Sequence, residues 1–415
     1  MKRWIPVLAV AALAAACLGG WAGYRYILFR VDEAALELGR EALREKRYDE
    51  AREHLAPVLE RRPDWSESAY MLSLCALATG DADSAVPLLE RIPPGMPWSD
   101  NAALRLAQLR YERQGRLADA ERGLESLLDR HKADAIGTSA RSTLEQIYLD
   151  EGRVAEALGL LESRFPLDPT PVPLLRRHWD LDRNGPPLEP WEKSLAEHQK
   201  RAPDDDRVAL GLASLDLKRG RVDRAVERID GCLKQRPDDP AVWHARLAWA
   251  RLAGRPDEAL RAAKKVRGDR SSPAERCHFR RGWPEAGDAA AERAALEKLA
   301  EQQPLQALVR LIELAPANES AALRDRKSKL DKAADRYRML VEGDPGPSSF
   351  VELATLAESL GRRFEAWAWA SLALRGNPND TLMAEAVERL DPVKAPRPAS
   401  ESTLADLLSS APVNP

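Results

Sequence analysis

Cysteine is scarce in this chain of 415 residues, and its placement excludes two classes of small scaffold. The four cysteines lie far apart and form no CxxC pair; they are Cys17, Cys75, Cys232 and Cys277. A disulfide framework needs several closely spaced cysteines, and a zinc ribbon needs two CxxC pairs. We therefore expect a fold that is held together by its hydrophobic core.

The chain also lacks an excess of positive charge. It carries 63 lysines and arginines against 66 aspartates and glutamates, which gives a formal net charge of −3. A general nucleic-acid binder needs a basic excess to neutralise phosphates, so this balance argues against nucleic acid as a partner. Apolar residues make up 44% of the chain and charged residues 31%, a composition that can build a core and excludes bulk disorder.

Catalytic signatures are missing as well. No phosphate-binding glycine loop, HExxH, GxSxG or kinase motif occurs in the sequence. One grouping resembles a metal site, Cys277 and His278 with His244 upstream, but zinc usually needs three or four ligands brought together. We interpret it as a buried thiol and two polar imidazoles. The sequence predicts no catalytic residue, no metal, no cofactor and no enzyme; an active site within residues 270–345 is the alternative.

The N-terminus carries a membrane signal. Lys2 and Arg3 precede an uncharged run from Trp4 to Tyr24, which is 24 − 4 + 1 = 21 residues. At about 1.5 Å per helical residue this run spans a hydrocarbon core of about 30 Å. Tryptophan and tyrosine lie near both ends of the run, where the headgroup region favours them. We predict an N-terminal transmembrane signal-anchor over residues 1–30.

Two other interpretations of this segment remain open, and its orientation follows from flanking charge. A signal peptide could be cleaved near Ala14–Ala16, and these alanines before Cys17 weakly resemble a bacterial lipobox. The basic residues Lys2 and Arg3 favour a cytoplasmic N-terminus, although arginines follow the run too. We predict a single-pass protein of the inner (cytoplasmic) membrane whose body lies on the periplasmic side.

The body of the chain repeats every 34 residues. Ala51 and Ala85 are 34 apart, and so are Ala225 and Ala259. Each of these alanines opens an amphipathic run after a glycine or a polar turn, and many runs end at a proline such as Pro63. The spacing predicts two helices per repeat, with small residues where they cross. A pair of short helices cannot bury its apolar face alone, so neighbouring pairs must stack.

This pattern resembles the tetratricopeptide repeat (TPR) over residues 32–380. That stretch holds 380 − 32 + 1 = 349 residues, or about ten units of 34. The clearest units are 32–65, 66–99, 206–239, 240–273 and 347–380. The resemblance implies an all-α fold, an α-solenoid of about ten TPR-like helix-turn-helix repeats behind one N-terminal transmembrane helix.

Irregular stretches divide the solenoid. Prolines crowd residues 166–190 and interrupt the pattern, while Glu319–Val341 is typical of one long amphipathic helix. We therefore divide the body into an N-terminal TPR block at 31–165, a proline-rich degenerate repeat or junction at 166–205, a C-terminal TPR block at 206–390 and a flexible tail at 391–415.

The resemblance also implies a binding surface, because the first helix of each TPR lines a concave groove that holds peptides. The groove positions carried over to this sequence are Arg40, Arg44, Tyr70, Arg105, Arg113, His244 and Arg251. Arginines on one wall favour an acidic segment or a C-terminal carboxylate. The alternative is that they are ordinary solvated arginines. The clamp of chaperone-binding TPRs, with Lys and Asn at fixed positions, is absent.

Two functions fit this organisation. The first is a membrane-tethered, non-enzymatic scaffold that binds proteins through the concave groove. The second is an assembly or biogenesis factor for envelope proteins, polysaccharide export or cytochrome maturation, which would hold its client transiently. In both, the partners are proteins and the membrane, and nothing in the sequence indicates an oligomeric state.

Overall fold

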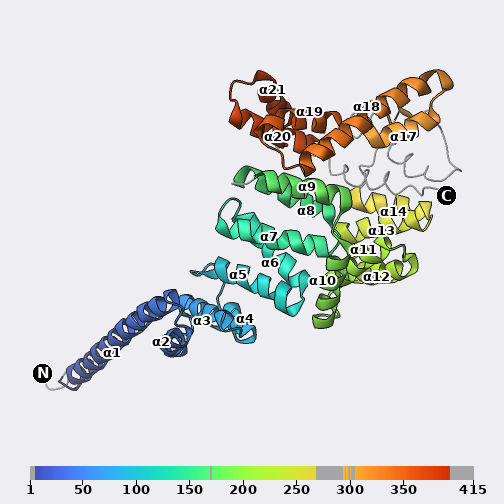
Figure 1. Ribbon diagram of the computed structural model, residues 1–415. Coiled ribbons are helices and arrows are strands. Elements are labelled where there is room, and N and C mark those ends of the chain that lie inside the picture. The colour runs from blue at the N-terminus through green and yellow to red at the C-terminus, as the bar shows by residue number, and fades with distance from the viewer. Residues whose placement is uncertain are drawn as a thin grey trace. The chain divides into compact units, whose positions relative to one another are not determined.

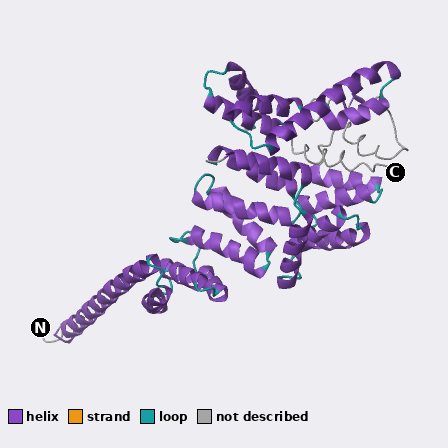
Figure 2. Ribbon diagram, viewed as in Figure 1, coloured by secondary structure: helices purple, strands orange, loops and turns teal. Residues whose placement is uncertain are grey.

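The computed structural model describes residues 5–168, 171–267 and 304–392, together with residues 293, 294, 296, 297 and 300. The side chains of residues 5–18, 256, 267 and 306 are not described. Within these ranges every regular element is helical and no strand occurs (Figure 2). The predicted all-α class is confirmed for this part of the chain.

The chain divides into two compact units. The first unit contains Met1–Gln114 and Asp119–Ala140, and the second contains Gly115–Ala118 and Arg141–Pro415. The helices that begin in the first unit are α1 (Ile5–Arg44), α2 (Tyr48–Arg61), α3 (Ser66–Ala78), α4 (Ala82–Glu90), α5 (Ser99–Leu109), the π-helical turn Arg110–Gln114, and α7 (Ala135–Asp150), which ends in the second unit (Figure 1). Most of α6 (Leu117–Arg130) also belongs to the first unit.

The second unit continues the series of helix pairs. Its elements are α8 (Val154–Arg164), a 3₁₀ turn at Phe165–Leu167, α9 (Pro171–Asn184), α10 (Leu188–Arg201), α11 (Asp206–Lys218), α12 (Val222–Gln235), α13 (Pro240–Leu252), α14 (Pro256–Arg267), α17 (Pro304–Leu314), α18 (Ala317–Glu342), a 3₁₀ turn at Pro347–Ser349, α19 (Phe350–Ser359), α20 (Arg363–Gly376) and α21 (Thr381–Leu390). The predicted junction at 166–205 lies within this unit and contains α9 and α10.

Left-handed glycines end the first helices of the repeats. After α11, Gly220 adopts φ 70°, and the amide of Arg221 donates to the carbonyl of Asp216 at 2.8 Å. Gly254, 34 residues later, has φ 66° after α13 and is followed by the same bond from Arg255, at 2.7 Å. A bond that reaches back five residues over a left-handed glycine closes the helix and reverses the chain. The 34-residue period in the sequence therefore corresponds to the spacing between the glycines that end successive first helices.

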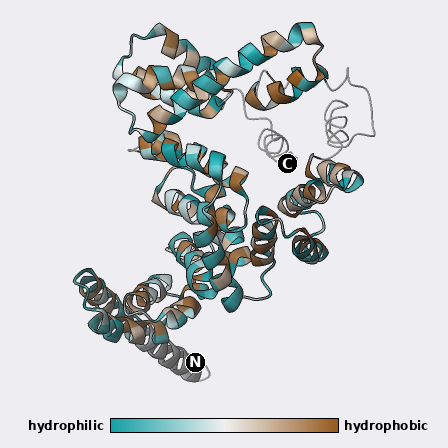
Figure 3. Cartoon of the chain, turned by 45° about the vertical axis from the view of Figure 1, so that its right-hand side comes forward, coloured by the Kyte–Doolittle hydropathy of each residue, from teal (hydrophilic) through white to brown (hydrophobic). Residues whose placement is uncertain are grey.

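Small residues let paired helices approach closely, as the sequence predicted. A Cβ added to Gly39 of α1 would lie 2.6 Å from the side chain of Leu55 on α2. Ala51 and Ala85 are fully buried, and so are Ala225 and Ala259 in the second unit. Buried apolar residues from α1–α5 form one core cluster and those from α11–α14 form another, and apolar and polar residues alternate along these helices (Figure 3). Each helix pair thus buries its apolar stripe against the next pair.

Three further predictions concern the irregular and terminal segments. The long helix predicted at Glu319–Val341 is confirmed as α18, although 34-residue repeats are built from shorter helices. No helix in the part of the chain searched, which is limited to described residues, is long and apolar enough to cross a membrane. The side chains of residues 4–18, most of the predicted membrane run, lie outside the described ones. So does the predicted tail from residue 393 onward.

Candidate interaction surface and buried polar joint

Arg40, the first predicted groove residue, is held in an ion-pair network between α1 and α3. Its Nε donates to Oε1 of Glu67 at 2.7 Å, and its guanidinium also pairs with Glu37 one turn earlier. The hydrogen bond that Arg40 donates to the Glu67 carboxylate raises the pKa of Arg40 above its ordinary value. Arg40 thus ties the first two repeats together, so its charge is already compensated within the chain.

The other arginines predicted in the first unit present their side chains to solvent. Arg44 near the end of α1, Arg105 on α5 and Arg113 in the π-helical turn are all exposed. Arg105 donates to Oε1 of Gln108 at 3.2 Å within its own helix. Among the described residues, no ion pair of these three arginines with a carboxylate is found. Their charges are available to a partner.

Partly exposed apolar side chains occur on α1 and α3 of the same unit. Leu43 of α1 and Leu74 and Leu77 of α3 are partly exposed while packing on the core of the first unit. Tyr70, the predicted aromatic groove residue, is buried on the same side of α3 as Leu74 and Leu77, four and seven residues later. We call the predicted groove residues of the first unit, Arg40, Arg44, Tyr70, Arg105 and Arg113, together with these leucines, the groove surface. This set combines apolar side chains with the three exposed arginines Arg44, Arg105 and Arg113.

Trp98 completes this surface, and the sequence analysis missed it. Its ring stacks on Tyr70, with centroids 5.2 Å apart and planes 16° from parallel. It precedes α5 with φ 70°, in the left-handed region, which costs a non-glycine residue about 1–2 kcal/mol. Stacking of this kind contributes about 0.5–1.5 kcal/mol, so it roughly offsets the strain. The sequence carries no signal for it, because left-handed positions are usually marked by glycine.

His244 and Arg251 lie in the second unit, on α13. Both are partly exposed, and their separation of seven residues places them on one side of the helix. Cys277 and His278, which the sequence groups with His244, fall outside the described residues. Among the described residues, no three His, Cys, Asp or Glu side chains are placed to hold a metal ion.

A buried polar contact joins helices that are far apart in the sequence. The joint, as we call it, is the contact of α8 and α9 with α18 and α20 (Figure 1). Phe165, after α8, lies edge-to-face against Phe364 and Trp367, with ring centroids 5.8 and 5.3 Å away. Helix α9 is the first helix of the fifth pair and α20 belongs to the last pair described, so the joint bypasses the pairs α11 with α12 and α13 with α14.

His178 is the charged centre of the joint. Its Nδ1 lies 3.2 Å from Oε1 of Glu365, and its Nε2 lies 3.1 Å from Oε1 of Glu162. A neutral imidazole has only one N–H, so two carboxylate neighbours favour the doubly protonated ring. Burial by itself would lower the pKa of His178, but the hydrogen bonds and charges of Glu162 and Glu365 outweigh it and raise the pKa to about 9.

Glu365 accepts hydrogen bonds from two further side chains in the joint. Arg362 donates to Oε1 at 3.0 Å, and the hydroxyl of Tyr337 donates to Oε2 at 2.6 Å. Trp369 in turn donates from Nε1 to the Tyr337 oxygen at 3.0 Å. Burial would raise the pKa of Glu365, but Arg362 and His178 hold it at about 2. Because Glu365 and His178 are each only 2% exposed and fully hydrogen-bonded, the joint has a structural role.

A second attachment holds α10 and α11 to the end of α7. The indole of Trp191 donates to the carbonyl of Asp150 at 2.7 Å, and Ser194 donates to the carboxylate of Asp150 at 2.9 Å. A Cβ on Gly211 would lie 2.3 Å from that same carbonyl, so α11 crosses α7 where only glycine fits. Helices α10 and α11, which follow the proline-rich residues, are thus packed tightly against the end of α7.

Comparison with protein families identifies the repeat. A family model described as tetratricopeptide repeat matches residues 42–97 and 193–248. These matches fall in both units and agree with the 34-residue spacing of the helix stops. The chain therefore carries tetratricopeptide repeats, as the sequence predicted.

A curated relative and several solved structures resemble the chain. Cellulose synthase operon protein C of Xanthomonas axonopodis pv. citri (strain 306) is 30% identical over 242 residues, which cover 54% of this chain and 16% of that protein. The TPR domain of P58(IPK) is 16% identical, covering 88% of this chain and 99% of its own, with a TM-score of 0.26. Yeast Tom70 is 15% identical, covering 92% and 96%, with a TM-score of 0.23.

Proposed function

We propose that the protein is a non-enzymatic scaffold that binds other proteins through the groove surface of its first unit. One observation carries the proposal: exposed arginines on α1 and α5 occur together with partly exposed leucines on α1 and α3, the first helices of the first three repeats. An apolar floor supplies binding energy, while arginines add charge-assisted hydrogen bonds to carboxylates. The partner is therefore a protein segment with apolar and acidic residues, or a C-terminal carboxylate.

The scaffold is tethered to the inner membrane in this proposal, with its body on the periplasmic side. The support is the uncharged run from Trp4 to Tyr24 and the basic residues that precede it. Helix α1 runs without interruption from Ile5 to Arg44, so the tether and the first helix of the first repeat are one helix. A partner bound at Arg40 or Arg44 would then lie at a fixed height above the bilayer.

A second candidate function is assembly of envelope components. The curated relative is a protein of a cellulose synthase operon, which favours polysaccharide export over cytochrome maturation within this candidate. The two functions differ in how long the partner stays bound. A scaffold keeps its partner in stoichiometric amounts at steady state, whereas an assembly factor holds its client only while the client is being made.

Crosslinking in the native cell tests the binding proposal. The intact protein is compared with a triple variant in which Arg44, Arg105 and Arg113 become glutamate. Arg40 is left unchanged, because reversing its charge beside Glu37 and Glu67 would break the contact between the first repeats. The matched control reverses three exposed arginines elsewhere in the first unit, Arg52, Arg91 and Arg122.

We expect defined partners that are captured by the intact protein and by the control but not by the groove variant. Partners that persist in the groove variant would place binding elsewhere and contradict the proposal. Inhibition of partner synthesis separates the two functions, since only the complexes of an assembly factor would then disappear.

Alkaline carbonate extraction tests the tether: the intact chain should stay in the membrane pellet, and its release would count against an anchor.

A further inference from the structure

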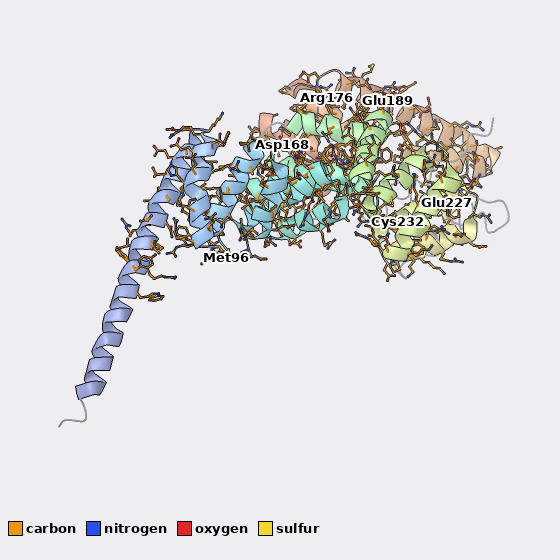
Figure 4. The ribbon with its side chains drawn as sticks, turned by 90° about the horizontal axis from the view of Figure 1, so that it is seen from below. Met96, Asp168, Arg176, Glu189, Glu227 and Cys232 are labelled. Atoms are coloured by element: carbon orange, nitrogen blue, oxygen red, sulfur yellow. The ribbon has the colours of Figure 1, made fainter. Side chains whose placement is uncertain are left out.

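One side of α1 carries a row of exposed apolar residues. Ile27 is 62% exposed, Val31 51% and Leu38 49%, and Ala34 is exposed between them. The four residues follow one another at steps of four, three and four, which keeps them on one side of a helix. Figure 4 shows the N-terminal half of α1 extending beyond the other helices of the first unit, as Figure 1 does. We call these four residues the outer stripe.

A different side of α1 packs on the first unit. Asp32 is only 1% exposed and accepts hydrogen bonds from Arg61 and Arg62 at the end of α2, both at 2.9 Å. Leu36 is buried, and Gly39 lies where a Cβ would meet α2. At about 100° per residue, these positions lie roughly 140° round the helix from the outer stripe. The stripe therefore points away from the core of its own unit.

Charged residues surround the upper part of the outer stripe. Arg30 pairs with Glu33 at 2.8 Å, Glu37 pairs with Arg40, and Glu41 is exposed. A helix side that faces only water is expected to be polar throughout. An apolar row that continues between such charges is instead typical of the contact between two helices.

The row continues into the predicted membrane run with a period of 11 residues. Ile27 lies 27 − 16 = 11 residues after Ala16, and the next two members of the stripe follow Gly20 and Gly23 by the same interval. A Cβ on either glycine would meet no atom within 4 Å, so the helix surface is open there. Eleven residues make about three helical turns, so a second helix can follow the row. Small residues let membrane helices approach closely.

The position of the row defines the kind of partner that can cover it. A soluble protein would cover only the part above the bilayer, and lipid would cover only the part within it. The partner is therefore a helix that leaves the membrane beside α1. A second α1 has small residues at the same depth and aliphatic ones at the same height, and the tether gives it the same direction. From Ala16 to Leu38, 38 − 16 = 22 residues, the two helices could meet over about 33 Å.

We propose that α1 of a second copy of this chain packs in parallel along the outer stripe and makes the protein a dimer. Val31, Ala34 and Leu38 form the contact above the bilayer, and Gly20 and Gly23 let the helices approach within it. This inference rests on the tether of the proposed function, because the tether sets the parallel direction. Each copy keeps its own groove surface, so a partner with two acidic segments binds the dimer with greater avidity than it binds one copy.

Cysteine crosslinking in isolated membranes tests this contact. The background is the full chain with Cys17→Ala and Cys277→Ala, in which the remaining Cys75 and Cys232 are buried. Two copies with different epitope tags are produced together, and copper phenanthroline oxidises cysteines that come within reach of each other. The dimer is then measured on non-reducing gels, and the two tags show that both chains are copies of this protein.

Two series of single cysteines map the contact. The stripe series places the cysteine at Val31, Ala34 or Leu38. The control series uses the charged residue directly before each, about 100° round the helix, which is Arg30, Glu33 or Glu37. A disulfide forms only between closely placed Cα atoms, so we expect the stripe series to give about tenfold more dimer than the control series.

A paired substitution separates recognition from folding. Val31→Lys with Leu38→Lys puts charge on the stripe, so it should reduce the crosslink at Ala34→Cys about tenfold. The thermal midpoint should stay near that of the parent, because neither side chain belongs to the buried core of the unit. The matched control, Glu53→Gln with Glu60→Gln, changes the net charge equally at two exposed positions of α2 and should leave the crosslink unchanged.

Equal dimer yields from the two series would overturn the proposal, and so would a stripe crosslink that survives the paired lysines. A crosslink from the stripe to a different protein would also overturn it. Carbonate extraction of the same membranes judges the tether separately. If the chain stays in the pellet and the series do not differ, the dimer is wrong while the tether stands. If the chain is released, stripe crosslinks between the two tagged copies would support the dimer without the tether, and their absence would refute both.

Discussion

Replacing Glu365 with glutamine removes the negative charge that faces His178 and Arg362 while keeping the size and shape of the side chain. The change lies at the centre of the joint, where Glu365 is 2% exposed and accepts hydrogen bonds from α9, α18 and α20. The variant therefore leaves the buried imidazolium of His178 and the partly buried guanidinium of Arg362 with less compensating negative charge. We expect α9 and α20 to separate more readily, while the helix pairs of the first unit are unaffected.

The magnitude follows from the pKa of His178, which the joint raises from 6.5 to about 9. A shift of this size corresponds to roughly 3 kcal/mol of stabilisation, at about 1.4 kcal/mol for each pKa unit. Because the folded-state pKa lies above the unfolded one, this stabilisation is complete below pH 6.5 and is lost as the pH rises through 9. Breaking a buried ion pair from one side costs a similar amount, about 3–5 kcal/mol.

Hydrogen exchange followed by mass spectrometry reports on the joint directly. At pH 7, peptides from α9 and α20 should exchange roughly a hundredfold faster in Glu365→Gln, while peptides from α2 and α3 serve as the internal control. Between pH 6.5 and 9, after correction for intrinsic exchange, protection of α9 should fall in the wild type and change little in the variant. Equal protection in both proteins, or a wild-type joint that is insensitive to this pH range, would refute the role assigned to His178.

Four further substitutions test the packing of the second unit, each by its thermal midpoint and circular dichroism. Gly211→Ala should destabilise strongly, because its Cβ would meet the carbonyl of Asp150, whereas Gly231→Ala on α12 has open space and should stabilise by about 0.5–1 kcal/mol. Trp191→Phe should cost about 1–3 kcal/mol, since it leaves that same buried carbonyl without its indole donor. Asp205→Ala should cost about 1 kcal/mol, because Asp205 caps α11 by accepting from two backbone amides; no loss would mean that water replaces the cap.

The regular part of the fold could be predicted because its determinants are local. Gly220 and Gly254 end helices through their own backbone conformation, and Ala51 or Ala225 marks a helix crossing by its size. Each of these residues acts within one 34-residue unit. The same residue types therefore recur in every regular unit, and the sequence shows them as a 34-residue period. The length of α18 could be predicted for the same reason, because its apolar residues keep helical spacing without an interrupting glycine or proline.

The joint could not be predicted, because its partners are separated by 187 residues and occur once. His178 and Glu365 look like ordinary charged residues of a first and a second helix, and only the approach of α20 to α9 buries them. Trp98 escaped prediction for a different reason. Trp98 adopts a left-handed backbone conformation, and a tryptophan in the sequence does not indicate such a conformation.

The joint also changes how the second unit responds to stress. In an open solenoid each repeat is stabilised only by its neighbours, so the terminal pair frays first and leaves distant repeats intact. Here α20 contacts α9, and loosening the last pair removes Glu365 from His178 of α9 and Phe364 from Phe165, which follows α8. Disruption near the C-terminal end must therefore be felt at α8 and α9, although the pairs between them intervene in the sequence. Burying an ion pair has a large desolvation cost, so the pair of His178 and Glu365 adds little net stability over apolar side chains of similar size. Its main effect is to select one arrangement of α9 and α20.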